Sequence, residues 1–303
     1  MNNEFVSIVL CTYNGIKFIE PQLSSIQKQT YGHLEIIIFD DASTDGTFQF
    51  LNEKALEDPR IQLFQNETNV GYNTNFSRAC LKAKGNYIAI ADQDDVWEEK
   101  KIAVLVKALS EDKDNMLAHC ISARFEENRK PHLRSIKLIN FFTGNDARKF
   151  LLQNIISGHN ILFRKEILES ALPFPSTVYY DWWLVMHACS AGKIIFINEI
   201  LTWHRVHENN ATGGAKPKTL FFKQTVNNLS HFLEIKNLRE DFYPLATSLR
   251  QHFSELHNQT FSLKLFLLIM KNASLLLAYK KKKIAWPSYL KHAIRYSKNT
   301  TLA

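Results

Sequence analysis

The sequence predicts an α/β protein with a mostly parallel central sheet, followed by a helical C-terminal region. Short apolar runs alternate with helical patterns over the first third of the chain, and the connections between them are brief. This alternation is typical of right-handed crossovers, which cover both faces of a parallel sheet with helices. Polar residues gather where the apolar runs end, at 12–15, 40–41 and 92–95. In such sheets, ligands bind outside the carboxyl ends of the strands.

Each element follows from its local composition. The first strand, 5–11, is rich in Val, Ile and Leu and ends at a turn-forming segment, 12–15. Further strands are expected at the apolar runs 35–40, 61–64, 87–91, 116–123 and 194–197. Helices are expected around 19–26, 48–51 (capped by 43–45), 73–83, 100–109, 146–155 and 181–191, and from residue 220 onward. The charged stretch 126–134 is expected to be an exposed loop.

Composition excludes several classes of protein. Of the 303 residues, 45% are hydrophobic and 22% charged, a globular composition that argues against global disorder. The length suits one large domain or two small ones. The four cysteines lie far apart with no CxxC pair, so we expect no disulfide framework or zinc cluster, and a reducing cytosol. The first residues lack a basic and apolar signal pattern, so no secretory signal is expected.

The net charge of +7 is divided unevenly along the chain. Residues 215–303 hold 15 Lys and Arg against 4 Asp and Glu, whereas residues 1–214 hold 22 against 26. We therefore expect a mildly acidic domain, 1–214, and a basic helical region, 215–303, joined near 213–217.

The basic region contains an apolar run, 261–279, followed by four lysines at 280–283. Lys264, Lys271 and Asn272 interrupt the run, which argues against a membrane-spanning helix of about 20 apolar residues. Two interpretations stay open: an amphipathic helix at an anionic membrane surface, or a helix packed on the preceding domain by its apolar face. No nucleic-acid partner is expected, because no recognisable nucleic-acid-binding module is present.

The most informative segment is Asp92-Gln93-Asp94-Asp95, which directly follows the strand 87–91. Carboxylates placed so close together repel one another, and a divalent cation with a preference for oxygen ligands, Mg²⁺ or Mn²⁺, relieves the repulsion. We interpret Asp92 and Asp94 in this way. Asp95 is interpreted as a solvated acid that opens the next helix.

A second acidic pair, Asp40 and Asp41, ends the strand 35–40. One of the two is expected to cap the next helix, and the other to accept hydrogen bonds from a base or ribose. The chain has no GxGxxG after the first strand, which weakens a dinucleotide-cofactor role, and no GxxxxGK[ST], which excludes a P-loop ATPase.

Several segments, taken in order, resemble glycosyltransferase family 2, whose members are inverting enzymes with the GT-A fold. The matching segments are 6–14, 29–30, 40–45, 69–71 with Asn75, and 92–97. Two later segments, 180–184 and 204–209 with Gly213, are similar to the rhamnosyltransferase-like subset that builds bacterial surface polysaccharides. The resemblance covers residues 5–210 and implies a nucleotide-sugar-binding α/β sandwich.

The resemblance also implies roles for matching residues. The nucleotide-sugar-binding set is Thr12, Tyr13, Asn14, Asp41, Asp92 and Arg205. Asp94 would bind Mn²⁺ or Mg²⁺, and Asp92 would contact ribose or a metal-bound water. His207 would complete the metal site or meet the diphosphate, although a lone histidine is more often a surface or core residue.

Asp181 matches the catalytic base of the family, although Tyr180 stands where an acidic residue often precedes it. A structural alternative for Asp181 is the N-cap of the helix that follows. The acceptor side would include Gly158, His159, Asn160 and Trp182. A simple turn explains the first three nearly as well, and tryptophans at a helix start are more often core residues.

Together these features predict a metal-dependent inverting glycosyltransferase. It would move a hexose or 6-deoxyhexose from a UDP- or dTDP-sugar to a saccharide or lipid-linked acceptor of lipopolysaccharide, O-antigen or capsule. The expected location is cytoplasmic, at the inner face of the plasma membrane. One alternative is a nucleotide-sugar-binding assembly partner; the other is a nucleotidyltransferase, which needs a basic N-terminal loop, whereas 12–17 offers one lysine.

Overall fold

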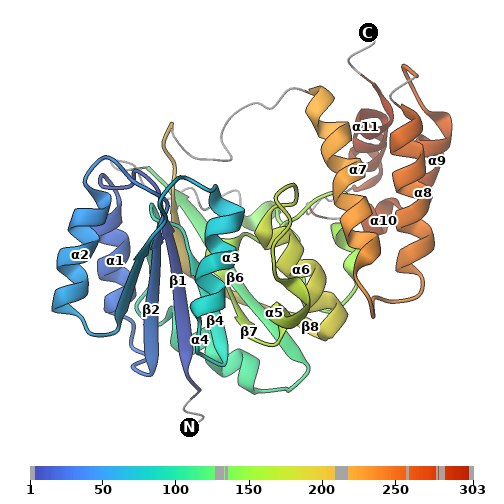
Figure 1. The fold of residues 1–303 in the computed structure, drawn as a ribbon. Coiled ribbons are helices and arrows are strands. Elements are labelled where there is room, and N and C mark those ends of the chain that lie inside the picture. Colours follow the sequence, from blue (N-terminus) through green and yellow to red (C-terminus); the bar gives the residue numbers. More distant parts are fainter. Residues whose placement is uncertain are drawn as a thin grey trace.

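The computed structural model describes residues 4–126, 133, 136–208, 218–256, 259–277, 279 and 284–299. Within these ranges an eight-stranded sheet lies between two layers of helices (Figure 1). The expected linker at 213–217, most of the charged stretch 126–134 and the lysines 280–283 lie outside the described residues.

The sheet is mostly parallel, as predicted. Its strand order is β3-β2-β1-β4-β7-β6-β8-β5. Only β7 and β5 run against their neighbours in the sheet. The strands are β1 (Val6–Thr12), β2 (Leu34–Asp40), β3 (Ile61–Gln65), β4 (Tyr87–Ala91), β5 (Val96–Trp97), β6 (Asn115–Phe125), β7 (Ile161–Arg164) and β8 (Lys193–Arg205).

Side chains alternate between the two faces of the sheet, because successive residues of a strand point in opposite directions. In β1, Val6, Ile8 and Leu10 join one hydrophobic cluster, while Val9 and Cys11 join the other. The first cluster is covered by α1 (Ile19–Gln27), α2 (Thr47–Glu57) and α4 (Lys101–Ser110). The second is covered by α3 (Tyr72–Lys82), α5 (Ile167–Ala171) and α6 (Tyr180–Ala191).

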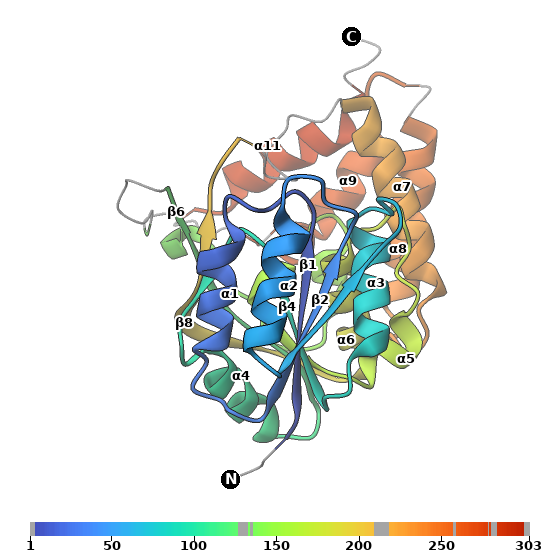
Figure 2. The same cartoon turned by 60° about the vertical axis from the view of Figure 1, so that its left-hand side comes forward.

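The C-terminal helices continue the second cluster. They are α7 (Lys218–Glu234), α8 (Phe242–Glu255), α9 (Leu263–Lys271), α10 (Ala273–Leu276) and α11 (Trp286–Ser297). The ring of Trp182 in α6 lies 5.6 Å from that of Phe232 in α7. Arg148 forms ion pairs with Asp146 at 2.7 Å and with Asp241, beside α8, at 2.6 Å. Figures 1 and 2 both place α7, α9 and α11 toward the end of the molecule opposite the N-terminus.

Some sequence expectations are corrected. The expected helix at 146–155 is wrong: a short 3-10 turn, Ala147–Phe150, is followed by irregular chain. Asp146 accepts a hydrogen bond from the Arg148 backbone N–H, and Asn154 exchanges two with the backbone of Ile156. Such local side-chain bonds compete with a helical ladder. Two further 3-10 turns are Ile136–Leu138 and Gly158–Asn160.

The apolar run 261–279 forms two helices, α9 and α10, which are separated at Asn272. In the described part of the chain, no helix has both the length and the apolar character that crossing a bilayer requires.

Candidate active site

Polar segments from five strands meet at one edge of the sheet. The segments after β1, β2 and β4 lie at the carboxyl ends of parallel strands, and β8 ends at the same edge with His204 and Arg205. The turn Gly158–Asn160 precedes β7, which runs antiparallel to β4, so it also lies at this edge. The sheet topology thus brings together residues from 12 to 207.

The loop after β1 is held against the acidic loop after β4. The Gln93 side-chain amide accepts a hydrogen bond from the Tyr13 backbone N–H at 2.9 Å and donates one to the Tyr13 carbonyl at 3.1 Å. A Cβ on residue 15 would lie 2.2 Å from Gln93 Oε1, so this approach requires Gly15. Asn14 has a positive φ of 47°, and its Oδ1 accepts from the Thr44 N–H at 2.9 Å.

The two acids that end β2 have different partners. Asp40 is buried and accepts hydrogen bonds from the hydroxyls of Thr12 (2.9 Å) and Ser43 (2.6 Å). Asp41 is also buried, and its carboxylate accepts from the Asn66 side chain and from the backbone N–H groups of Val70 and Gly71. Asp40 therefore shapes the turn after β2, and Asp41 fixes the loop 66–71. The nucleotide role of Asp41 stays a prediction.

Neighbouring acids of the loop after β4 have very different environments. The side chains of Asp92, Asp94 and Asp95 are 35%, 15% and 0% exposed, respectively. Asp94 Oδ2 lies 2.7 Å from His207 Nε2, and the His207 ring stacks on Phe18 with centroids 4.4 Å apart. Burial raises the pKa of the Asp94 carboxyl, and the negative charges of Asp92 and Asp95 raise it further. A bound cation would relieve this repulsion.

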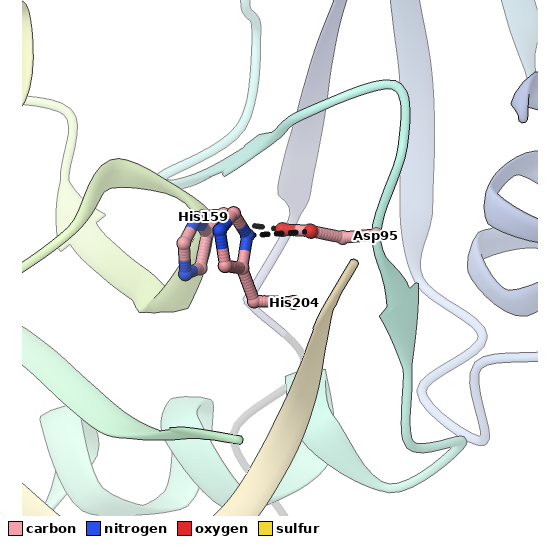
Figure 3. Close-up of side chains that lie close together, drawn as sticks. All are labelled: Asp95, His159 and His204. Carbon is pink, nitrogen blue, oxygen red and sulfur yellow. Dashed lines mark hydrogen bonds and ion pairs between the residues drawn. The ribbon is translucent and has the colours of Figure 1, made fainter. Parts of the chain in front are cut away.

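Asp95 corrects the expectation of a solvated acid. It is followed by β5 and not by a helix, and its Oδ1 lies 3.0 Å from His204 Nδ1 and accepts from the Arg205 N–H at 3.2 Å. Its Oδ2 lies 3.4 Å from His159 Nδ1 (Figure 3). The rings of His159 and His204 stack with centroids 4.9 Å apart. Burial by itself raises the pKa of Asp95, but His159 and His204 outweigh it, so this pKa is lowered overall.

His159 connects the buried acid to the more exposed one. Its Nδ1 also lies 3.2 Å from Asp92 Oδ2, and its Nε2 lies 2.9 Å from the Ser122 hydroxyl. Burial lowers the pKa of His159, but the charges of Asp95 and Asp92 outweigh burial and raise it overall. His159 was predicted on the acceptor side; here it contacts Asp92 and Asp95 of the loop after β4.

Lys101 is a buried residue at this site that the sequence did not single out. Its Nζ donates a hydrogen bond to the His159 carbonyl at 2.6 Å and lies 3.3 Å from the centroid of the Trp97 ring. Burial lowers the pKa of Lys101 to about 7. A lysine at the start of a surface-type helix gives no sequence signal for such a position.

Two groups of side chains could hold a metal ion. One is the pair Asp94 and His207, and the other is the buried group Asp95, His159 and His204, whose ligand atoms all lie within 4.8 Å of one another. Carboxylate oxygen and imidazole nitrogen are ligands that Mn²⁺ and related ions accept. The donor atoms therefore suit a divalent cation, and the pair is the more exposed of the two groups.

Asp181 lies in the first turn of α6, after the N-cap residue Tyr179, so it is not the N-cap. Its Oδ1 accepts a hydrogen bond from the Trp182 N–H at 2.6 Å. Burial raises the pKa of Asp181 to about 6, with the charge of Asp92 as a further cause. Asn73 positions this helix start by accepting from the Tyr180 N–H at 3.2 Å and donating to the preceding chain.

Tyr180, where an acid was expected, is buried and extends into the site. Its hydroxyl lies 3.4 Å from Asp92 Oδ1. A Cβ on residue 158 would lie 2.2 Å from this hydroxyl, so Gly158 makes room for the tyrosine.

The other residues assigned to the acceptor side make internal contacts. Asn160 donates to the Cys120 carbonyl at 3.0 Å, and the Trp182 indole N–H donates to the Phe150 carbonyl at 2.8 Å. Their acceptor role stays a prediction. Arg205, assigned to the diphosphate, is buried; its Nε donates to the Asp94 carbonyl at 3.1 Å and its guanidinium faces Phe18 and Phe125.

Solved structures share this fold. TarS of S. aureus in complex with UDP-GlcNAc has a TM-score of 0.64 and 18% identity, covering 95% of this chain and 79% of that one. A mannosyltransferase of Pyrobaculum calidifontis in complex with GDP-Man and Mn²⁺ has a TM-score of 0.61 and 19% identity, covering 96% and 85%. The fold is therefore the GT-A fold of glycosyltransferases, as predicted.

A sequence model described as Glycosyl transferase family 2 matches residues 7–172. The chain belongs to this family and is a glycosyltransferase. The family assignment favours a glycosyltransferase over the two alternatives, a nucleotide-sugar-binding assembly partner and a nucleotidyltransferase.

Curated relatives match over shorter regions. An uncharacterized protein of Mycobacterium bovis is 27% identical over 208 residues, 67% of this chain and 59% of that protein. The putative teichuronic acid biosynthesis glycosyltransferase TuaG of Bacillus subtilis is 37% identical over 97 residues, 32% of this chain and 38% of TuaG. The Escherichia coli glucosyltransferase WfaP, which acts on α-D-GlcNAc-diphosphoundecaprenol, is 40% identical over 100 residues, 33% and 39% of the two chains. The chain thus matches less than two thirds of the length of these relatives.

Proposed function

We propose that the protein is a metal-dependent inverting glycosyltransferase that moves a sugar from a UDP- or dTDP-sugar to an acceptor in bacterial cell-surface polysaccharide synthesis. The observation that carries the proposal is the meeting of Asp94 and His207 at 2.7 Å on the carboxyl edge of the sheet. Asp92 lies in the same loop, and its negative charge contributes to the raised pKa of Asp181. A donor site and a base thus share one edge.

In this proposal, Asp94 and His207 hold Mn²⁺ or Mg²⁺. When bound, the metal neutralises the charge that develops on the departing diphosphate. Arg205, with a planar guanidinium suited to phosphate oxygens, would add a further positive charge beside the Asp94 backbone. Tyr13 and Asn14, on the loop that Gln93 holds in place, would contact the nucleoside.

Asp181 acts as the general base. With a pKa of about 6, its carboxyl is mainly ionised at pH 7 yet basic enough to take a proton from an attacking hydroxyl. The acceptor oxygen attacks the anomeric carbon from the face opposite the diphosphate, so the C–O bond to the diphosphate breaks as the new one forms. The configuration of that carbon inverts in a single step.

The relatives favour a donor and an acceptor class. WfaP uses UDP-Glc and an undecaprenol-linked sugar, TuaG is named for teichuronic acid synthesis, and TarS is seen with UDP-GlcNAc. We therefore propose a saccharide or lipid-linked acceptor of lipopolysaccharide, O-antigen or capsule type, used at the inner face of the plasma membrane.

Calorimetry with UDP, dTDP, GDP and their sugars, with and without Mn²⁺, tests the proposal. The wild type is expected to bind a uridine or thymidine donor more tightly with Mn²⁺. In Asp94→Asn, the gain in donor affinity on adding Mn²⁺ is expected to be at least tenfold smaller than in the wild type. This variant is also expected to lose most of its transfer activity. The matched control is Asp114→Asn, an exposed acid before β6, which should behave as wild type. Mn²⁺-dependent binding and turnover retained by Asp94→Asn would refute the metal role.

A further inference from the structure

We propose that the outer face of the α9–α11 helix pair is a docking surface for an anionic lipid bilayer. The inference extends the proposed lipid-linked acceptor by naming the surface that would bring the enzyme to it. Its residues are Phe261, Leu263, Lys264, Leu267, Lys271, Lys291, Arg295 and Lys298.

The charge of this part of the chain is of one sign. After Glu255 the sequence contains no Asp or Glu, whereas it holds 9 Lys and Arg. In a helix packed on a domain only for stability, basic and acidic residues are normally interspersed on the solvent side. A run of this length without an acid fits an anionic surface, to which each basic residue adds attraction.

Helix α9 has two apolar faces, one buried and one exposed. Leu265 and Ile269 are fully buried in the core, which satisfies the packing interpretation for that face. Leu263 and Leu267, one turn apart, are 61% and 56% exposed. The exposed Lys264 and Lys271 flank these leucines. Leucines flanked by lysines are the pattern of an interfacial helix, in which lysine stems cover apolar groups and their amines reach the headgroups.

Helix α11 adds a basic stripe. Ala293 and Tyr296 face the core, whereas Lys291 and Arg295 are exposed on the other side. Basic residues on the solvent side of a helix beside exposed leucines match anionic headgroups above an apolar layer.

The start of α9 and the end of α11 are held together by backbone contacts. Phe261 and Lys298 form an antiparallel bridge, and the Ser262 N–H donates to the Ser297 carbonyl at 3.0 Å. The start of α9 therefore lies beside the end of α11, with the exposed Leu263 next to the basic stripe. Both views place this pair toward the end of the molecule at which β1 finishes, which is also the edge that carries the site (Figures 1 and 2).

A bilayer fits this surface better than a nucleic acid or a protein. Nucleic-acid surfaces pair basic residues with polar or stacking groups, and paired exposed leucines have no role there. A surface that binds a protein normally has a polar rim, in which we expect charges of both signs. Headgroup phosphates above an apolar layer match both the basic residues and the leucines.

Co-sedimentation of the full chain with vesicles tests the inference. Wild type is expected to bind vesicles of phosphatidylcholine with one-third phosphatidylglycerol at least about tenfold more tightly than pure phosphatidylcholine, and less tightly at high salt. The double variant Lys264→Glu with Lys271→Glu is expected to bind the phosphatidylglycerol vesicles about tenfold more weakly than the wild type. Leu263→Ser with Leu267→Ser is expected to weaken binding several-fold, with less salt dependence in the loss.

Matched controls carry the same changes elsewhere. Lys107→Glu with Lys113→Glu, and Leu56→Ser with Leu81→Ser, alter exposed residues on other surfaces and should bind as wild type. Equal binding of the wild type to both vesicle types, or equal losses in surface and control variants, would overturn the inference. Lipid binding without sugar transfer to a soluble acceptor would count against the proposed function alone, and transfer without lipid binding against this inference alone.

Discussion

Two acid–imidazole groups, built from adjacent residues of one loop, differ in what surrounds them. Asp94 meets His207 at the surface of the site, with 15% and 18% of their side chains exposed. Asp95 is fully buried between His159 and His204, and its Oδ1 also accepts a hydrogen bond from the Arg205 N–H. The same two kinds of side chain are thus partly exposed in one group and enclosed in the other. Burial therefore distinguishes the two groups, although their residue types are the same.

The largest expected effect concerns Asp181, the proposed base at the same edge of the sheet. Asp181→Asn removes the proton acceptor while keeping the shape, so transfer should fall about a thousandfold with donor affinity unchanged. Single-turnover transfer together with calorimetric donor binding measures both. If transfer persists, Asp181 is not the base.

Asp95→Asn tests the buried side. It leaves two stacked imidazoles and a backbone N–H without their anion, so the free energy of unfolding should fall by about 3 kcal/mol. Asp94→Asn, next to it, should change stability by less than about 1 kcal/mol because its partner is partly solvated. Urea denaturation of the two variants makes the comparison. Equal losses would mean that both acids are structural.

Gly158→Ala tests the packing of the turn that carries His159 against Tyr180. The new Cβ would lie 2.2 Å from the Tyr180 hydroxyl, on the turn that carries His159, so we expect a loss of about 2 kcal/mol in stability. Gly32→Ala is the matched control, since nothing lies within 4 Å of a Cβ there. Thermal unfolding distinguishes them, and a neutral Gly158→Ala would show that Tyr180 moves freely.

The pH dependence of transfer reports on Asp181 directly. The pKa of this carboxyl is raised from 3.8 to about 6, and only its ionised form accepts a proton. Transfer should therefore be level above pH 6 and fall about tenfold per pH unit below it. The same profile in Asp181→Asn would assign the ionisation to another group.

The smallest expected effect concerns Trp182. Trp182→Phe keeps a ring facing Phe232 but removes the hydrogen bond to the Phe150 carbonyl, so stability should fall by about 1 kcal/mol. The acceptor KM of this variant is the sharper measurement. A marked rise would support the predicted acceptor-side role, whereas an unchanged value would leave Trp182 as a core residue.

The sequence by itself determined the parallel sheet, the polar segments at the carboxyl ends of its strands and the acidic loop, because these depend on local apolar patterns and on where strands end. It also indicated Asp94, His207 and Asp181 through a family resemblance. The family match covers residues 7–172, and the roles of these three residues stay predictions. It misjudged Asp95 and did not find Lys101, and it expected a helix at 146–155 that local side-chain bonds prevent.

Only the tertiary structure decided which of the adjacent acids faces outward. Burial depends on the approach of β8 and of the turn before β7, segments separated from the acidic loop by more than sixty residues of chain. The apolar run of the basic region shows the same limit. Its composition allowed packing or membrane contact, and the fold divides it between a buried face at Leu265 and an exposed one at Leu263. Helical periodicity shows that residues share a face, but only neighbouring elements determine whether that face is covered.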